Sequence, residues 1–151
     1  MILALVAAQV LLPNAHAHND YLHPRPLLDA LDQGFCSVEA DVFPVDGDLL
    51  VAHTRPEIRP SNTLKRLYLD PLAARIRANR GWVHTRGQRF QVLIDFKTEG
   101  EICLGTLLRQ LRAYPELAGT WAQPGPVSFV ISGARPISLL EKLDGFPVSF
   151  D

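Results

Sequence analysis

The chain has 151 residues, of which 47 % are hydrophobic and 21 % charged, and its formal net charge at pH 7 is −1. This composition is typical of a globular protein with enough apolar residues for one substantial core. The near-zero charge lacks the basic excess of nucleic-acid-binding proteins, so we expect no nucleic-acid partner.

The first twelve residues, MILALVAAQVLL, form an apolar segment that is too short to span a bilayer. The segment is similar to the hydrophobic region of a secretory signal, although no Lys or Arg precedes it. A buried first strand is the alternative. We therefore expect no transmembrane span and a secreted or periplasmic protein, or otherwise a cytoplasmic one.

The rest of the chain, residues 13–151, predicts strands that alternate with helices. Strands are expected to end near residue 18 and to cover residues 36–44, 45–53, 90–97, 127–133 and 146–151, with helices over residues 25–34, 63–78, 102–114 and 137–143. The strands are apolar runs, which indicates a parallel α/β sheet covered by helices on both faces.

Two carboxylates interrupt the strand SVEADVF at Glu39 and Asp41. Because side chains of a strand alternate, both acids point to one face, while Val38, Ala40 and Val42 point to the other. A bound divalent cation commonly makes two adjacent buried negative charges tolerable. An exposed edge strand with a solvated acidic face is the alternative explanation.

More polar residues lie at or near the carboxyl ends of the predicted strands, where parallel α/β folds place their active sites. They are His16, His18, His53, Asp95 and Lys97. Asp95 would complete a set of oxygen ligands suited to Mg²⁺ or Ca²⁺. Lys97 could hold a phosphate oxygen, and a buried ion pair with Asp95 is its alternative role.

Histidine titrates near neutral pH, which makes His18 and His53 candidates for a general acid and a general base. His16 shares a face with His18 and is the main alternative to it. His23 and His84 are expected on the surface. The two cysteines, Cys36 and Cys103, match no zinc motif and allow either one disulfide or two buried thiols.

The segment NAHAHNDYLHPRPLLDALDQGFCSVEADVFPVDGDLLVAH, followed later by DFK, resembles the phosphatidylinositol-phospholipase-C-like phosphodiesterase superfamily. Its similarity is greatest to the altered-inheritance-of-mitochondria protein 6-like branch, and it covers residues 13–151. The shared layout is a His ending the first strand, an ExD pair, a second His and a later acid-x-Lys. The resemblance implies cleavage of a glycerophosphodiester or lipid-type phosphodiester by a TIM barrel, here cut after about five strands.

The resemblance also implies roles for individual residues. It makes Glu39, Asp41 and Asp95 the ligands of Mg²⁺ or Ca²⁺, His18 and His53 the acid–base pair, and Lys97 and Asn19 contacts of the substrate. His18 is preferred over His16 because polar Asn19 and Asp20 follow it, as polar residues follow the catalytic His in relatives.

Two alternatives remain at this point. His16 and His18 could form the HxH metal motif of an amidohydrolase or related phosphatase. That motif needs further His ligands on later strands, for which only His53 and His84 are available, and His84 is expected in a loop. The other alternative is a non-catalytic remnant, because a barrel cut after its fifth strand leaves an open sheet edge.

Overall fold

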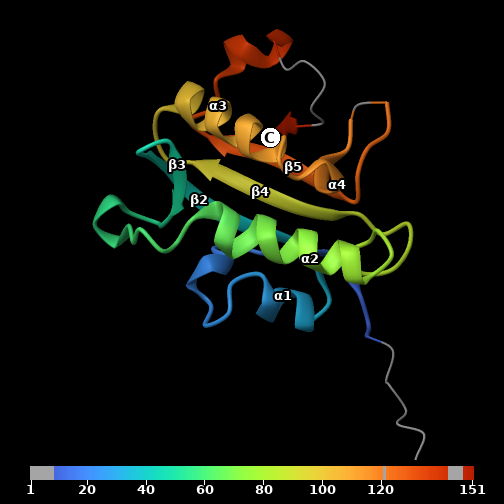
Figure 1. Ribbon diagram of the computed structural model, residues 1–151. Helices are drawn as coiled ribbons and strands as arrows, with labels where there is room; N and C mark the ends of the chain where they lie inside the picture. The colour runs from blue at the N-terminus through green and yellow to red at the C-terminus, as the bar shows by residue number, and fades with distance from the viewer. Residues whose placement is uncertain (1–8, 121, 143–147) are drawn as a thin grey trace, which may run out of the picture.

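The structure is a computed structural model that describes residues 9–120, 122–142 and 148–151. Its sheet contains β1 (Leu12–Ala17), β2 (Phe35–Val45), β3 (Asp48–Val51), β4 (Phe90–Phe96), β5 (Val127–Gly133) and β6 (Val148–Phe150). Five strands run parallel in the order β1-β2-β4-β5-β6, and β3 pairs antiparallel with β2. This order follows the chain without reversal (Figure 1) and confirms the predicted parallel α/β sheet.

A helix or turn is present in each of the four regions where the sequence predicts a helix, but each is shorter than predicted. The α-helices are α1 (Leu28–Asp32), α2 (Asp70–Ala78), α3 (Gly100–Leu111) and α4 (Pro115–Ala118); η1 (Asp20–Leu22), η2 (Arg55–Glu57) and η4 (Ile137–Lys142) are 3₁₀ turns, and η3 (Lys65–Leu69) is a π turn. The helix expected over residues 63–78 is therefore η3 followed by α2. Pro71 lies in the first turn of α2, where its missing N–H costs least.

The helices pack on one face of the sheet. On β4, Phe90, Val92, Ile94 and Phe96 are at most 1 % exposed, whereas the alternate residues are only partly buried. Figure 1 shows α2 and α3 in front of the strands. The prediction that both faces are covered is wrong for the described residues, because the apolar runs reflect the helix-covered face and the other face carries polar side chains.

Burial corrects one expectation and decides another. His84, expected on the surface, is buried, because its Nε2 reaches the carbonyl oxygen of Phe35 at 2.8 Å. Cys36 and Cys103 are free buried thiols, which excludes the disulfide. Burial raises the pKa of Cys103 to about 12, so this thiol is unreactive at neutral pH.

The apolar amino-terminal segment lies mostly outside the described residues, which begin at residue 9. Within the described ranges, no helix has the length and hydrophobicity needed to cross a bilayer.

Candidate functional site

The register of the sheet brings the predicted carboxylates to one face. Asp41 on β2 lies directly opposite Asp95 on β4, and Asp95 lies opposite Ser132 on β5. Glu39 lies two residues before Asp41, and both are buried although they point away from the helices. The juxtaposition expected from alternation along SVEADVF and VLIDFK is therefore present, at the carboxyl end of β4.

Lys97 joins two of these carboxylates. Its Nζ lies 3.2 Å from Asp41 Oδ2 and 3.2 Å from Asp95 Oδ2, and the Ser132 hydroxyl donates to Asp95 Oδ1 at 2.8 Å. Burial alone would lower the pKa of Lys97, but the hydrogen bonds and charges of the two aspartates outweigh it and raise the pKa. Lys97 is thus a fixed cation between β2 and β4.

His53 reaches this face through a hairpin. Strand β3 turns back along the end of β2, the Ala52 amide donates to the Asp41 carbonyl oxygen at 3.2 Å, and the His53 Nδ1 lies 3.0 Å from Asp41 Oδ2. The sequence predicts His53 in the site because it follows a strand of a parallel sheet, but β3 is antiparallel to β2, so His53 reaches the site for a different reason. Asp41 orients the half-exposed ring, whose Nε2 has no protein partner among the described residues.

The two histidines of β1 and its end differ in their surroundings. His18 is 74 % exposed at the side chain, and its Nε2 lies 3.3 Å from Glu39 Oε2. His16 is less exposed, lies 4.0 Å from the same oxygen and has its Nδ1 2.7 Å from the Ser37 hydroxyl. The geometry therefore favours His18 as the histidine available for chemistry.

The residues after His18 hold the acidic pair in place. The backbone N–H of Asn19 donates to Glu39 Oε2 at 3.1 Å, and Asn19 has a left-handed backbone conformation with φ 50°. The contact of Asn19 with the acids is thus a backbone one, while its side-chain oxygen lies 3.1 Å from the Tyr21 hydroxyl.

Tyr21 belongs to the site but was missed by the sequence interpretation. Its hydroxyl lies 2.8 Å from Asp41 Oδ2 and 3.3 Å from His53 Nδ1. Burial, followed by the hydrogen bond to Asp41, raises the pKa of Tyr21, so the phenol stays a donor at neutral pH. Tyrosine does not titrate near neutral pH, so it is not among the residues first considered as acids or bases. The one feature of the sequence that points to Tyr21 is its position three residues after His18.

The carboxylates suit a hard cation by type but not by arrangement. Within the described ranges, no three His, Cys, Asp or Glu side chains gather in a way that could hold a metal ion. The Lys97 ammonium group already contacts one carboxylate oxygen of Asp41 and one of Asp95, and the same Asp41 oxygen also contacts Tyr21 and His53. The side chains as they lie do not fit a three-carboxylate cation site, and they do not fit the HxH alternative either.

Comparison with known proteins places the chain in a family. The family model described as the AIM6-like phosphodiesterase domain matches residues 5–146. The chain belongs to this family. The name of the family indicates a phosphodiesterase-like function for this AIM6-like domain, whereas the wider superfamily suggested by the sequence stays a prediction.

Curated relatives carry the same family name. The altered inheritance of mitochondria protein 6 of Eremothecium gossypii is 30 % identical over 83 % of this chain, and that of Kluyveromyces lactis is 29 % identical over 84 %. A homolog from Arthroderma benhamiae is 29 % identical over 82 %. The AIM6-like domain spans 38 %, 39 % and 48 % of the lengths of these three relatives. No solved structure matches the chain.

Proposed function

We propose that this AIM6-like domain hydrolyses a phosphodiester, with His18 and His53 as the proton-transfer pair. The observation that carries the proposal is that each histidine is paired with its own buried carboxylate, His53 with Asp41 at 3.0 Å and His18 with Glu39 at 3.3 Å. A carboxylate fixes the ring orientation of its histidine and stabilises the imidazolium that forms during proton transfer.

The reaction needs one proton removed and one supplied. One imidazole takes the proton of the nucleophile, which is water or a neighbouring hydroxyl of the substrate, as the new P–O bond forms. The other imidazole protonates the leaving alcohol oxygen as the old P–O bond breaks. Lys97, at the edge of the same cluster, faces the phosphate oxygens as a point charge.

Charge balance bears on the proposed cation. Three carboxylates against one ammonium leave the cluster with two excess negative charges when the histidines are neutral. An anionic phosphodiester therefore needs more positive charge nearby, and Mg²⁺ or Ca²⁺ at Glu39, Asp41 and Asp95 stays our proposal for its source. Lys97 would have to leave the two aspartates for one ion to reach all three residues.

Calorimetric titration with Mg²⁺ and Ca²⁺ tests this cation. Saturable binding that is lost in Asp95→Asn supports it, and equal heats in the wild type and Asp95→Asn contradict it.

The finer points of fold, substrate and location are also proposals. A strand order without reversal and a polar second face support a sheet that forms part of a TIM barrel. We propose a glycerophosphodiester or lipid-type substrate, on the family resemblance, and a secreted or periplasmic location, on the apolar first twelve residues. A structure of the protein at its full length would test the barrel.

The activity is tested with bis(p-nitrophenyl) phosphate and the protein at its full length. We expect His53→Ala and Glu39→Ala to lower the rate about 100-fold or more, because each removes half of a histidine–carboxylate pair. His23→Ala, which changes an exposed histidine outside the cluster, is the control and should keep the wild-type rate. Wild-type rates in both site variants would contradict the proposal.

A further inference from the structure

A buried carboxyl group lies beside the candidate active site and takes no part in the chemistry proposed above. Asp20 begins η1, two residues after His18, and is fully buried. Its Oδ1 has no hydrogen-bond partner in the part of the chain that the structure describes. Removal of a carboxyl group from water destabilises a fold, and an unpaired oxygen increases that cost. We therefore expect Asp20 to have a role other than stability.

The other oxygen of Asp20 joins two segments of the chain. Asp20 Oδ2 accepts a hydrogen bond from the Leu27 N–H at 2.5 Å and another from the Tyr68 hydroxyl at 2.9 Å. Leu27 directly precedes α1, and Tyr68 lies in η3, fully buried in the apolar core. The carboxyl group thus closes the β1–α1 loop, residues 18–27, and ties this loop to the core.

The backbone of this loop is strained at Leu27. Its φ is 65° and its ψ is −49°, and the Leu28 N–H donates to the Pro26 carbonyl oxygen at 2.7 Å. These values describe a γ-turn with positive φ, which is rare and is unfavourable for a bulky side chain. Such strain persists only where the surroundings impose it, and it is frequent at functional sites. The hydrogen bond to Asp20 is one contact that holds Leu27 in this conformation.

The same loop carries two groups that contact the carboxylates of the candidate active site. The Asn19 N–H donates to Glu39 Oε2 at 3.1 Å, and the Tyr21 hydroxyl lies 2.8 Å from Asp41 Oδ2. Both carboxylates belong to the proposed histidine–carboxylate pairs. Asn19 and Tyr21 are the two neighbours of Asp20 in the chain, so a shift of the Asp20 backbone displaces both of them.

We propose that Asp20 is a positioning residue that sets the Tyr21 hydroxyl against Asp41 through its own contacts with Tyr68 and Leu27. Asp20 acts through its neighbours and does not touch the substrate. The proposal rests on the hydrolytic function proposed above. Because Asp41 orients a proton-transfer group and does not bind the substrate, loss of the anchor lowers kcat and leaves KM near the wild-type value.

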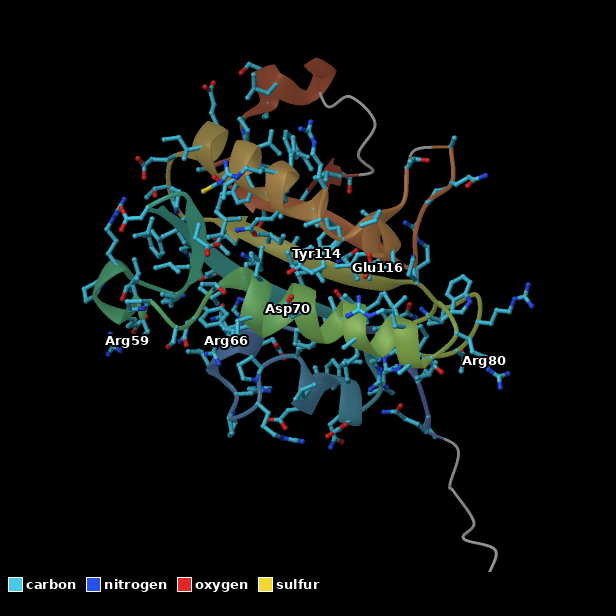
Figure 2. The ribbon with its side chains drawn as sticks, viewed as in Figure 1. Arg59, Arg66, Asp70, Arg80, Tyr114 and Glu116 are labelled. Atoms are coloured by element: carbon cyan, nitrogen blue, oxygen red, sulfur yellow. The ribbon has the colours of Figure 1, made fainter. Side chains whose placement is uncertain are left out.

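Tyr68→Phe is the mildest test, because it removes one hydroxyl group and keeps the ring in the core. With bis(p-nitrophenyl) phosphate and the full-length protein, we expect kcat to fall about fivefold with KM unchanged. Tyr114→Phe is the matched control. Its hydroxyl donates to Asp70 Oδ1 at 2.6 Å, and Figure 2 shows these two residues near the start of α2. The control should keep the wild-type kcat, and a wild-type kcat in Tyr68→Phe would overturn the proposal.

A Tyr21→Phe background shows whether the anchor acts through Tyr21. If Asp20 positions the Tyr21 hydroxyl, Tyr68→Phe should lose most of its effect on kcat once that hydroxyl is absent. A merely structural role of Tyr68 would lower kcat by the same factor in both backgrounds. That result would overturn the proposal.

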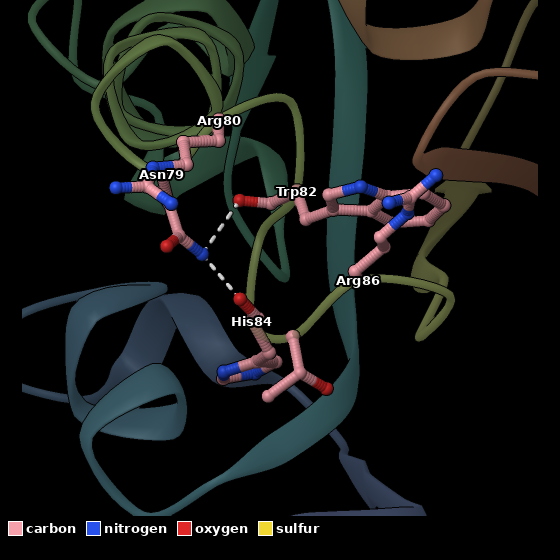
Figure 3. Close-up of a pocket in the computed structure, with 6 residues that line it drawn as sticks. Asn79, Arg80, Trp82, His84 and Arg86 are labelled. Atoms are coloured by element: carbon pink, nitrogen blue, oxygen red, sulfur yellow. Dashed lines mark hydrogen bonds between the residues drawn. The ribbon is translucent and has the colours of Figure 1, made fainter.

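Substitutions of Asp20 separate its hydrogen bonds from general destabilisation. Asp20→Asn keeps an acceptor oxygen for both donors and should stay within about threefold of the wild-type kcat, whereas Asp20→Ala should lose about tenfold or more. Asn79→Ala is the control, because the Asn79 amide holds another loop through the carbonyl oxygens of Trp82, at 3.0 Å, and His84 (Figure 3). Equal kcat in Asp20→Ala and Asn79→Ala would contradict the proposal. If Asp20→Ala does not fold by circular dichroism, Tyr68→Phe decides.

Hydrogen exchange measures the position of the loop without substrate. The Asn19 N–H is held by Glu39, so its exchange should become about tenfold faster in Tyr68→Phe and stay at the wild-type rate in Tyr114→Phe. Unchanged exchange in Tyr68→Phe would overturn the proposal even if the protein hydrolyses the phosphodiester. Faster exchange in a protein that hydrolyses nothing would support the anchoring of the loop by Asp20 and contradict only the hydrolytic function.

Discussion

At the scale of single residues, Asp41 is the centre of the candidate active site. Its Oδ2 is contacted by the Tyr21 hydroxyl at 2.8 Å, the His53 Nδ1 at 3.0 Å and the Lys97 Nζ at 3.2 Å. These three groups come from η1, from the residues that follow β3 and from the end of β4. A substitution of Tyr21 or Lys97 is therefore expected to change the position of Asp41 and, through it, the orientation of the His53 ring.

Tyr21→Phe tests this coupling. The variant keeps the aromatic ring and loses the hydroxyl that contacts Asp41 and His53, so we expect kcat for phosphodiester hydrolysis to fall about tenfold. The free energy of unfolding should change by no more than about 1 kcal/mol, since one hydrogen bond is lost. Tyr114→Phe, which removes the hydroxyl bound to Asp70 at 2.6 Å on the surface, is the control and should keep kcat. An unchanged kcat in Tyr21→Phe would count against the coupling.

At the scale of elements, the end of β5 supports the third carboxylate. Gly133 has φ +69°, and a methyl group there would lie 2.5 Å from the Phe96 carbonyl oxygen and 2.6 Å from Asp95 Oδ1. Both distances are too short, and the atoms that would have to move include the carboxylate that Lys97 binds. A glycine at this position keeps β5 close enough for Ser132 to reach Asp95.

Gly133→Ala is therefore expected to lower activity as well as stability. The left-handed backbone alone costs about 1–2 kcal/mol in any non-glycine residue, and the displacement of Asp95 adds to that. Gly87→Ala is the matched control, since Gly87 has φ +87° with no atom within 4 Å of the added methyl group. Urea unfolding and kcat are measured on both variants. Equal losses of kcat would show that the contact with Asp95 has no role.

The elements also show what the sequence can predict. The two-residue spacing in SVEADVF and VLIDFK correctly places Glu39, Asp41 and Asp95 on one face, because alternation is a property of the strand itself. Two other contacts of the site depend on the path of the loops. One is that of His53, which an antiparallel strand brings back to Asp41, and the other is that of Tyr21 with Asp41. Local periodicity contains no information on either, so both are found only in the folded chain.

At the scale of the whole molecule, burial is the quantity that the sequence predicted least well. Apolar runs in the strands indicated helices on both faces, yet one face is packed and the other carries the polar cluster. The residues beside His84 in the sequence, Val83 and Thr85, do not mark it as buried. Its burial follows from a contact with Phe35, which lies 49 residues away in the chain. Periodicity tells which side chains share a face but not what covers that face.

The buried His84 predicts a pH dependence of stability. Burial lowers its pKa from the unfolded value of 6.5, so the folded ring is neutral where the unfolded ring binds a proton. This contribution to stability is complete above pH 6.5 and is lost as the pH falls below it. His84→Gln keeps a side-chain N–H for Phe35 without titrating, and its urea midpoint should fall less than that of the wild type between pH 7.5 and 5.5. His23→Gln is the control; an unchanged pH slope in His84→Gln would contradict the prediction.

The central claim is that His18 and His53 act together on one phosphodiester, and a double-mutant comparison tests it most directly. The rate of bis(p-nitrophenyl) phosphate hydrolysis is measured for His18→Gln, His53→Gln and the double variant of the full-length protein. Groups that act as a unit give strongly non-additive losses, so the double variant should be little slower than the slower single variant. Losses that multiply, or a wild-type rate in the double variant, would contradict the claim.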